Sequence, residues 1–225
     1  MIVDNHKSDF LPVAINHSFP KNTLLPKIIE SIKSTSQHFL LVLQNENRAN
    51  FNEDEFTALF VNQNQIQINK LGISIRVGEQ YRDIYHKTHG IPDIYYSFLE
   101  LGRNCEPVFI MEAKRLPTPG HNRIKEYVIG QTPTGNPNGG IERFKLERHG
   151  KGLLNCGMLG YIENDSFETW LQRINDWIFE LSAPWSQEEK LELVSIVEKL
   201  AYLNSVAIRE GDELKLHHFW IDIRR

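Results

Sequence analysis

Residues 92–101, PDIYYSFLEL, and residues 106–114, EPVFIMEAK, decide the fold that this sequence predicts. Both runs are rich in β-branched and aromatic side chains, and a short polar segment around Gly102 and Arg103 separates them. Two such runs on either side of a short turn are typical of an antiparallel β-hairpin. We therefore expect a hairpin whose turn is centred between Gly102 and Arg103.

The register of this hairpin brings two acidic side chains together. With that turn, Asp93 lies opposite Glu112, and directly opposed strand residues have Cβ atoms about 4.5–5.5 Å apart. Because side chains alternate along a strand, Lys114 shares the face of Glu112. Phe109 and Met111 then fall on the opposite face, toward the helices. The hairpin is expected to present two acids and a lysine on one face at one end.

This arrangement suits the hydrolysis of phosphodiester bonds. Two carboxylates that lie so close repel each other unless a cation separates them, and Mg²⁺ prefers such oxygen ligands. A bound metal polarises a phosphate and lowers the pKa of its water, while a lysine adds positive charge beside the transition state. We predict a metal-dependent catalytic centre formed by Asp93, Glu112 and Lys114. The alternative is an ion pair between strands in which Lys114 only neutralises Glu112.

The order of these residues also resembles a known family. Pro92-Asp93, followed by Glu112-Ala113-Lys114 at the end of an apolar run, is similar to the motif of the PD-(D/E)XK nuclease superfamily. Restriction endonucleases and many repair and defence nucleases belong to that superfamily. The resemblance implies a four-stranded mixed sheet flanked by helices. It also implies Mg²⁺ or Mn²⁺ bound by Asp93, Glu112 and the carbonyl oxygen of Ala113.

Two further segments extend the resemblance. An acidic helix before the hairpin carries Glu55, and the first core helix of that family often contributes a glutamate to the metal site. Glu55 has a second possible role, because Asn52 and Glu55 have the spacing of a capping box. The segment with Glu142, Arg143 and Lys145 is similar to the second core helix of the family.

Composition is consistent with one globular domain. The chain has 225 residues, of which 40% are hydrophobic and 24% charged, which is enough to bury a core without a metal or a disulfide. The two cysteines lie far apart in the sequence, so neither a disulfide nor a zinc site is expected. We expect a single nuclease-like domain with a helical part at residues 1–50, a core at about 50–180, and a helix and strand at 181–225.

Charge is unevenly distributed along the chain. Residues 113–151 contain eight Lys or Arg and three Glu, a charge of +5, which leaves −9 for the rest of a chain whose net charge is −4. A local basic stretch can bind phosphate without indiscriminate binding elsewhere. The residues expected to contact phosphates are Arg115, Arg123, Lys125, Arg143, Lys145 and Arg148.

Periodicity and turn signals predict the other elements. Helices are expected at residues 23–43, from residue 52 onward, at 141–148 and at 165–183, and strands at 72–82, 153–162 and 214–223. Residues 116–140 are rich in Gly, Pro, Asn and Thr and are expected to form a mobile surface loop. Ser186 and Glu189 have capping-box spacing, so a further helix carrying Leu191, Val194 and Leu200 is expected after them. Together these elements predict an α/β fold with a mixed sheet and a helical C-terminal portion.

These observations predict a small Mg²⁺- or Mn²⁺-dependent endonuclease of restriction or phage-defence type, acting on DNA rather than RNA. No apolar run approaches the roughly 20 residues of a membrane span, and the first ten residues lack a secretion signal, so a cytoplasmic protein is expected. Two alternatives remain open. One is a catalytically silent nucleic-acid-binding module of the same fold, and the other is a protein-interaction subunit of a defence complex. A homodimer or a protein partner is compatible with any of these readings.

Overall fold

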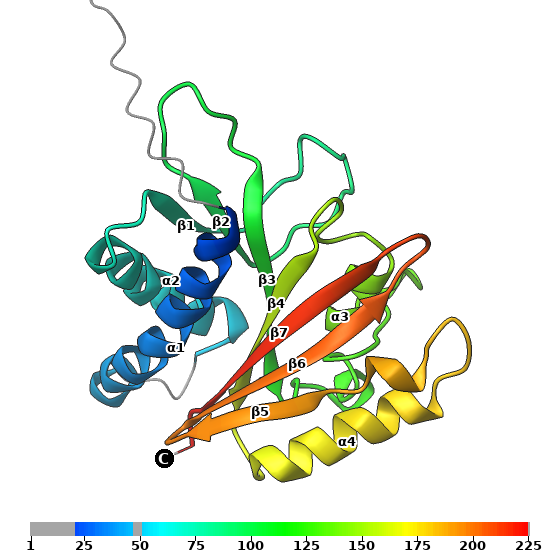
Figure 1. Ribbon diagram of the computed structural model, residues 1–225. Helices are drawn as coiled ribbons and strands as arrows, with labels where there is room; N and C mark the ends of the chain where they lie inside the picture. Colours follow the sequence, from blue (N-terminus) through cyan, green and yellow to red (C-terminus); the bar gives the residue numbers. More distant parts are fainter. Residues whose placement is uncertain (1–20, 47–50, 225) are drawn as a thin grey trace, which may run out of the picture.

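A seven-stranded mixed sheet forms the centre of the protein, with helices on both faces (Figure 1). The computed structural model describes residues 21–46 and 51–224. The strand order is β1-β2-β3-β4-β7-β6-β5, in which β3, β4 and β7 are parallel neighbours and the remaining pairs are antiparallel. The strands are β1 (Ile75–Glu79), β2 (Ile94–Phe98), β3 (Pro107–Leu116), β4 (Asn155–Ile162), β5 (Glu192–Val197), β6 (Leu200–Ile208) and β7 (Glu213–Asp222).

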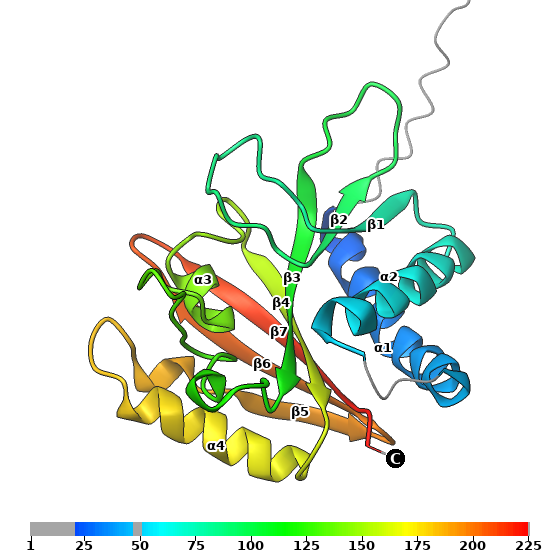
Figure 2. The ribbon, with the colours of Figure 1, turned by 180° about the vertical axis from the view of Figure 1, so that it is seen from behind.

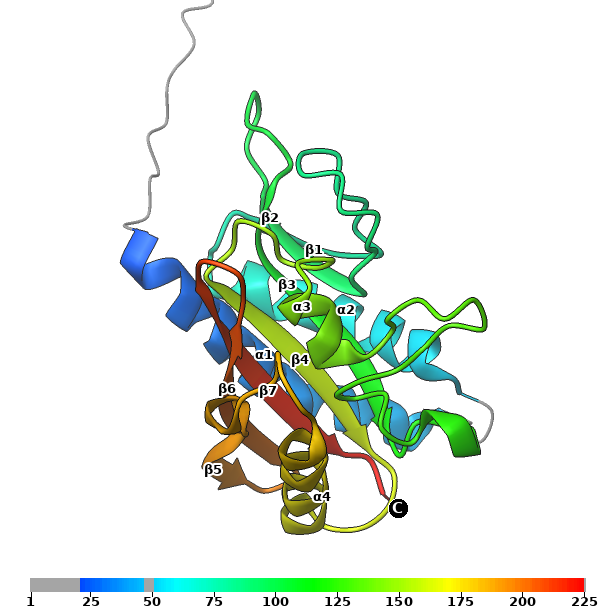
Figure 3. The ribbon, with the colours of Figure 1, turned by 90° about the vertical axis from the view of Figure 1, so that its right-hand side faces the viewer.

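Two helices cover one face of the sheet and two the other. Helices α1 (Lys21–Asn45) and α2 (Glu53–Lys70) pack on the face that carries Phe109 and Met111, as the hairpin alternation predicts. Helices α3 (Gly140–Lys145) and α4 (Phe167–Glu180) belong to the other face, and Figure 3 shows both in front of the sheet. Each face of the sheet therefore has its own hydrophobic core. Within the described residues, no helix combines the length and apolar character needed to cross a bilayer.

The hairpin register agrees with the prediction where it matters for the site. Ile94 pairs with Met111 and Tyr96 with Phe109. In this register Asp93, the residue before Ile94, comes opposite Glu112, the residue after Met111. An irregularity between Tyr96 and Ser97 shifts the register only toward the turn. The β1–β2 and β2–β3 loops contact each other, since the backbone N–H of Cys105 donates to the Tyr85 hydroxyl at 2.9 Å, and both loops lie in the upper part of Figure 2.

The prediction of a helix after Ser186 is wrong. Its capping box exists, because Ser186 N–H donates to Glu189 at 2.8 Å, but it closes a 3₁₀ turn of three residues (Gln187–Glu189). The following residues form β5 and β6, which pair with each other and, through β6, with β7. Most of the C-terminal portion after α4 is therefore strand, because long-range pairing with β7 outweighs the local spacing of apolar residues.

The Gly/Pro-rich segment at residues 116–140 is not simply a surface loop. It has little regular structure, a 3₁₀ helix η2 (His121–Arg123) and one isolated bridge between Gln131 and Pro137. Its middle is nevertheless inside the protein, since Tyr127 and Val128 are fully buried. The Tyr127 hydroxyl lies 2.8 Å from His218 Nδ1 and accepts a hydrogen bond from Trp220 Nε1 at 2.8 Å. The expectation of a surface loop is wrong for this anchored part.

Candidate active site

The backbone of the hairpin joins Asp93 to the strand that carries Glu112. Asp93 lies directly before β2, and its Oδ2 accepts a hydrogen bond from the backbone N–H of Ala113 at 2.7 Å. Ala113 stands between Glu112 and Lys114 in β3, where side chains alternate between faces. Ala113 itself packs among the α1/α2 core, so both charged neighbours project to the other side of the strand. The structure thus brings together Asp93, Glu112 and Lys114.

Glu112 lies at the centre of a cluster of basic side chains. Its side chain is fully buried, and Lys114 Nζ is 3.0 Å from Oε1. The Arg143 guanidinium donates to the same oxygen, and His149 Nδ1 lies 3.2 Å from Oε2. Burial by itself would raise the pKa of Glu112, but Lys114, His149 and Arg143 outweigh it and hold the pKa well below its usual value. Glu112 is therefore a carboxylate at any physiological pH.

Lys114 is a buried cation with several acceptors. Its Nζ donates to Glu53 Oε1 at 3.0 Å and to the carbonyl oxygen of Ala113 at 2.7 Å. Burial lowers the pKa of a lysine, yet the carboxylates of Glu112, Glu53 and Asp93 outweigh it and raise the pKa of Lys114 above its ordinary value. Lys114 therefore stays protonated and acts as a fixed positive charge.

Asp93 has the opposite electrostatic environment. Burial is the largest influence, and the nearby charge of Glu112 adds to it, so that the pKa of Asp93 lies well above its ordinary value. Lys114 and the N–H of Ala113 only partly offset this rise. A carboxylate held in this way favours either a proton or a cation beside it.

Helix α2 brings Glu53 to this cluster. The sequence had suggested Glu55 for this position, with capping as its second possible role. Glu53 contacts Lys114, and its Oε2 also accepts the backbone N–H of Arg115 at 2.9 Å. The exposed Glu55 instead accepts the backbone N–H of Asn52 at 2.6 Å, which completes a capping box at the start of α2. Capping alone accounts for Glu55.

The six basic residues expected to bind phosphate have different environments. Lys145 is buried, with Nζ 2.7 Å from Glu189 Oε1 and 2.8 Å from the carbonyl oxygen of Ile208, so its expected phosphate contact is wrong. Arg143 belongs to the Glu112 cluster. Arg115 pairs twice with Glu163, at 2.8 and 2.9 Å. The remaining three are at least partly accessible: Arg123 pairs with Glu126, Lys125 with Glu180, and Arg148 with the carbonyl oxygen of Pro137.

The donor set fits a hard divalent cation. In the described parts of the chain, no three His, Cys, Asp or Glu side chains are grouped so that they could hold a metal. The carboxylates of Asp93 and Glu112 and the carbonyl oxygen of Ala113 supply oxygen donors only, which Mg²⁺ combines with water or substrate oxygens. The raised pKa of buried Asp93 is what a neighbouring cation would relieve. The carbonyl oxygen of Ala113 accepts a hydrogen bond from Lys114 with one lone pair and has a second lone pair for a cation.

Sequence reasoning did not identify Glu53 or His149 as residues of this site. Glu53 lies in the same acidic turn as Glu55, and only the orientation of α2 separates their roles. His149 follows the α3 segment without any motif spacing. The paired histidines His217 and His218 are core residues, and burial lowers their pKa values to about 4 and about 3.

Comparisons of the chain with protein-family models, with curated proteins and with solved structures gave no significant match.

Proposed function

We propose that this protein is a metal-dependent nuclease that hydrolyses phosphodiester bonds, with Asp93 and Glu112 as ligands of Mg²⁺ or Mn²⁺ and Lys114 as a catalytic cation. The observation that carries the proposal is the hydrogen bond from Ala113 N–H to Asp93, together with the 3.0 Å contact between Lys114 and Glu112. These contacts gather two carboxylates and a lysine at one end of a hairpin. DNA is the proposed substrate, in an endonuclease of restriction or phage-defence type.

The order of elements supports the resemblance to the PD-(D/E)XK superfamily. An acidic helix, α2, precedes the antiparallel strands β1, β2 and β3, and α3 leads to β4, which is parallel to β3. The resemblance implies a four-stranded mixed sheet flanked by helices, and the strands β1 to β4 with α2 and α3 are the part of the seven-stranded sheet that supports it. The strands β5 to β7 extend that sheet, and they are additions that the resemblance does not include.

The chemistry of each residue follows from its protonation state. A bound cation supplies a Lewis acid for the phosphate and a more acidic water. Lys114 carries a proton throughout the physiological range, so it does not act as the base. Its role is to orient the phosphate or the attacking water and to stabilise the negative charge of the transition state. Glu53 holds the lysine in place from α2.

The silent binding module is the second candidate, and one observation favours it. Lys114 and Arg143 both pair with Glu112, and His149 Nδ1 lies 3.2 Å from it, so that this carboxylate already has two positive partners without a metal. A cluster of this kind could hold the hairpin together without catalysis. The accessible Arg123 and Lys125 would then bind nucleic acid passively.

The test is cleavage of supercoiled plasmid DNA and of a labelled RNA by the purified chain with Mg²⁺, Mn²⁺, Ca²⁺ or EDTA. The proposal expects cutting with Mg²⁺ and Mn²⁺ and little with Ca²⁺, which is larger and less suited to the reaction geometry. Cutting that survives EDTA would contradict it. Salt-sensitive DNA binding without Mn²⁺ binding or cutting would instead support the silent module.

A further inference from the structure

Arg143 bonds to the carboxylate that the proposed nuclease function assigns to a metal. Its guanidinium, in α3, donates to Glu112 Oε1, and Lys114 Nζ lies 3.0 Å from the same oxygen. A carboxylate oxygen has about two lone pairs, so two cationic partners leave Oε1 no position for a third. A metal can bind this oxygen only after one of the two side chains has left it.

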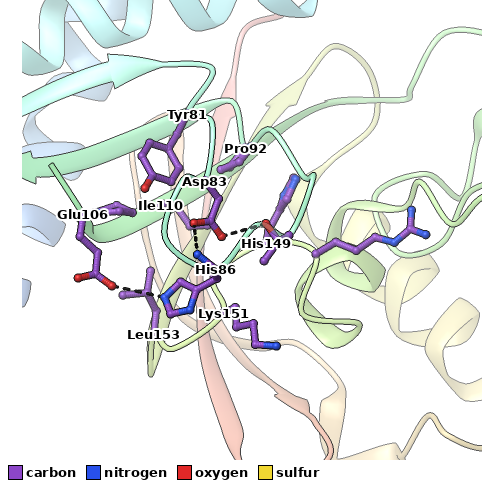
Figure 4. Close-up of a pocket in the computed structure, with 13 residues that line it drawn as sticks. Tyr81, Asp83, His86, Pro92, Glu106, Ile110, His149, Lys151 and Leu153 are labelled. Atoms are coloured by element: carbon purple, nitrogen blue, oxygen red, sulfur yellow. Dashed lines mark hydrogen bonds and ion pairs between the residues drawn. The ribbon is translucent and has the colours of Figure 1, made fainter.

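The other oxygen of Glu112 faces a closed part of the protein. His149 Nδ1 lies 3.2 Å from Oε2, and His149 also belongs to the wall of the small pocket shown in Figure 4. That pocket has room for about one water molecule, which is too little for a phosphate. The β1–β2 loop closes over the ring, because a Cβ on Gly90 would lie 2.4 Å from His149 Cδ2. A metal that also contacts a phosphate therefore has to bind on the side of Oε1.

Of the two cationic partners of Oε1, Arg143 is held less firmly. The Lys114 side chain is 4% exposed, and it also donates to Glu53 and to a backbone carbonyl. The Arg143 side chain is 21% exposed, and its other partner is the neutral amide oxygen of Asn138 in the Gly/Pro-rich segment. Arg143 is therefore the partner that can leave Oε1 and turn toward solvent.

A phosphate is the natural new partner for the released guanidinium. Once it has left Glu112, Arg143 is a partly buried cation whose remaining partner, Asn138, carries no charge. Arginine binds phosphate through two parallel N–H donors, in a geometry that its planar guanidinium fits. A phosphate on the Oε1 side of Glu112 therefore meets a cation that has lost its anionic partner.

We propose that Arg143 and the metal exchange on Glu112: Arg143 neutralises this carboxylate until a metal binds there, and then turns to the substrate phosphate. The inference rests on the proposed nuclease function and names how the same site is regulated. Metal and phosphate then bind cooperatively, because each favours the state in which Arg143 has left Glu112. The exchange also gives the Arg143–Glu112 pair a role in a catalytic protein, where the silent module would need it only as a structural contact.

Metal binding without substrate tests the exchange. Mn²⁺ is titrated by calorimetry into the wild type, Arg143→Met and the matched control Arg148→Met. Arg148 follows α3 and donates to the carbonyl oxygen of Pro137, so both variants lose one positive charge but only Arg143→Met frees Glu112. Arg143→Met should bind Mn²⁺ about tenfold more tightly than the wild type, because no charge-assisted hydrogen bond has to be broken first. Arg148→Met should bind Mn²⁺ as the wild type does.

The wild type allows a second measurement that does not depend on a variant folding. In EDTA, Glu112 and Asn138 each hold one Nη group of Arg143, so these groups should give separate signals in NMR spectra of the arginine side chains. Saturating Mg²⁺ should release the guanidinium, and the separate signals should merge or disappear.

The sign of the change in Mn²⁺ affinity distinguishes exchange from a structural role, since loss of a structural residue would weaken metal binding. Unchanged or weaker Mn²⁺ binding by Arg143→Met, an equal gain in Arg148→Met, or separate Arg143 signals that persist in saturating Mg²⁺ would each overturn the exchange. The two proposals fail separately. A wild type that binds Mn²⁺ and cuts DNA, with no gain in Arg143→Met, overturns only the exchange. Tighter Mn²⁺ binding by Arg143→Met in a chain that never cuts supports the exchange and overturns the nuclease.

Discussion

Glu53 Oε1 at the start of α2 lies 3.0 Å from Lys114 Nζ in β3. This contact links the first turn of a helix to the strand that carries the proposed metal ligand Glu112. Glu53 also accepts the N–H of Arg115, so it fixes both the lysine and the backbone beside it. The helix therefore positions Lys114, the proposed catalytic cation, and does not only cover the sheet.

The first prediction compares Glu53→Gln with Glu55→Gln. Glu53→Gln replaces the carboxylate that accepts from Lys114 with a neutral amide. The loss of this charge-assisted hydrogen bond, which contributes about 1.5–3 kcal/mol, should lower the cleavage rate about ten- to hundredfold. Glu55→Gln keeps the capping box, because glutamine serves in that position as well. The measurement is kcat for nicking of plasmid DNA with Mg²⁺. A larger loss from Glu55→Gln than from Glu53→Gln would contradict the roles assigned to the two residues.

The second prediction concerns the buried pair Lys145–Glu189. Lys145→Met leaves the Glu189 carboxylate buried without its cation, and the free energy of unfolding should fall by about 3–5 kcal/mol. Lys125→Met breaks the exposed pair with Glu180 and should cost no more than about 1 kcal/mol. Urea unfolding of both variants measures the difference. Equally small losses of unfolding free energy in the two variants would contradict a structural role for the Lys145–Glu189 pair.

The third prediction uses the buried His218. Burial, and then the neighbouring His217, lower the pKa of His218 to about 3, below the ordinary value of 6.5. Between these values the unfolded chain binds a proton that the folded chain excludes, so stability falls as pH drops below about 6.5. The slope from this residue is about 1.4 kcal/mol per pH unit. His218→Gln should flatten the pH dependence of urea unfolding, and the exposed His121→Gln serves as its control. An unchanged slope in His218→Gln would contradict this.

Residue alternation and a short turn were sufficient to predict the hairpin and the grouping of Asp93, Glu112 and Lys114 at one end of it. The turn centre near Gly102 set the register, and the observed pairing of Ile94 with Met111 agrees with it. Because a shift by one residue exchanges the two faces of a strand, this register also predicted which face Glu112 and Lys114 share. The apolar face with Phe109 packs on α1 and α2 as expected.

Long-range contacts account for what could not be predicted. Leu191, Val194 and Leu200 have helical spacing, yet β5 and β6 form because β6 pairs along its length with β7. Lys145 belongs to a basic run in the sequence, but Glu189 lies far along the chain and becomes its partner only after folding. Neither outcome depends on local propensity. His149 reaches Glu112 by the same kind of contact.

The central claim is tested most directly by Asp93→Asn, Glu112→Gln and Lys114→Ala, compared for Mn²⁺ binding by calorimetry and for DNA cleavage. The wild type should bind Mn²⁺ and cut. Lys114→Ala should bind Mn²⁺ nearly as well and cut about 10²–10⁴-fold more slowly, as expected for the loss of one positioned catalytic group. Asp93→Asn and Glu112→Gln should bind Mn²⁺ weakly, so that excess Mn²⁺ partly restores their cutting but not that of Lys114→Ala. Undiminished cutting by Lys114→Ala, or Mn²⁺ binding that is unchanged in Asp93→Asn and Glu112→Gln, would contradict the account.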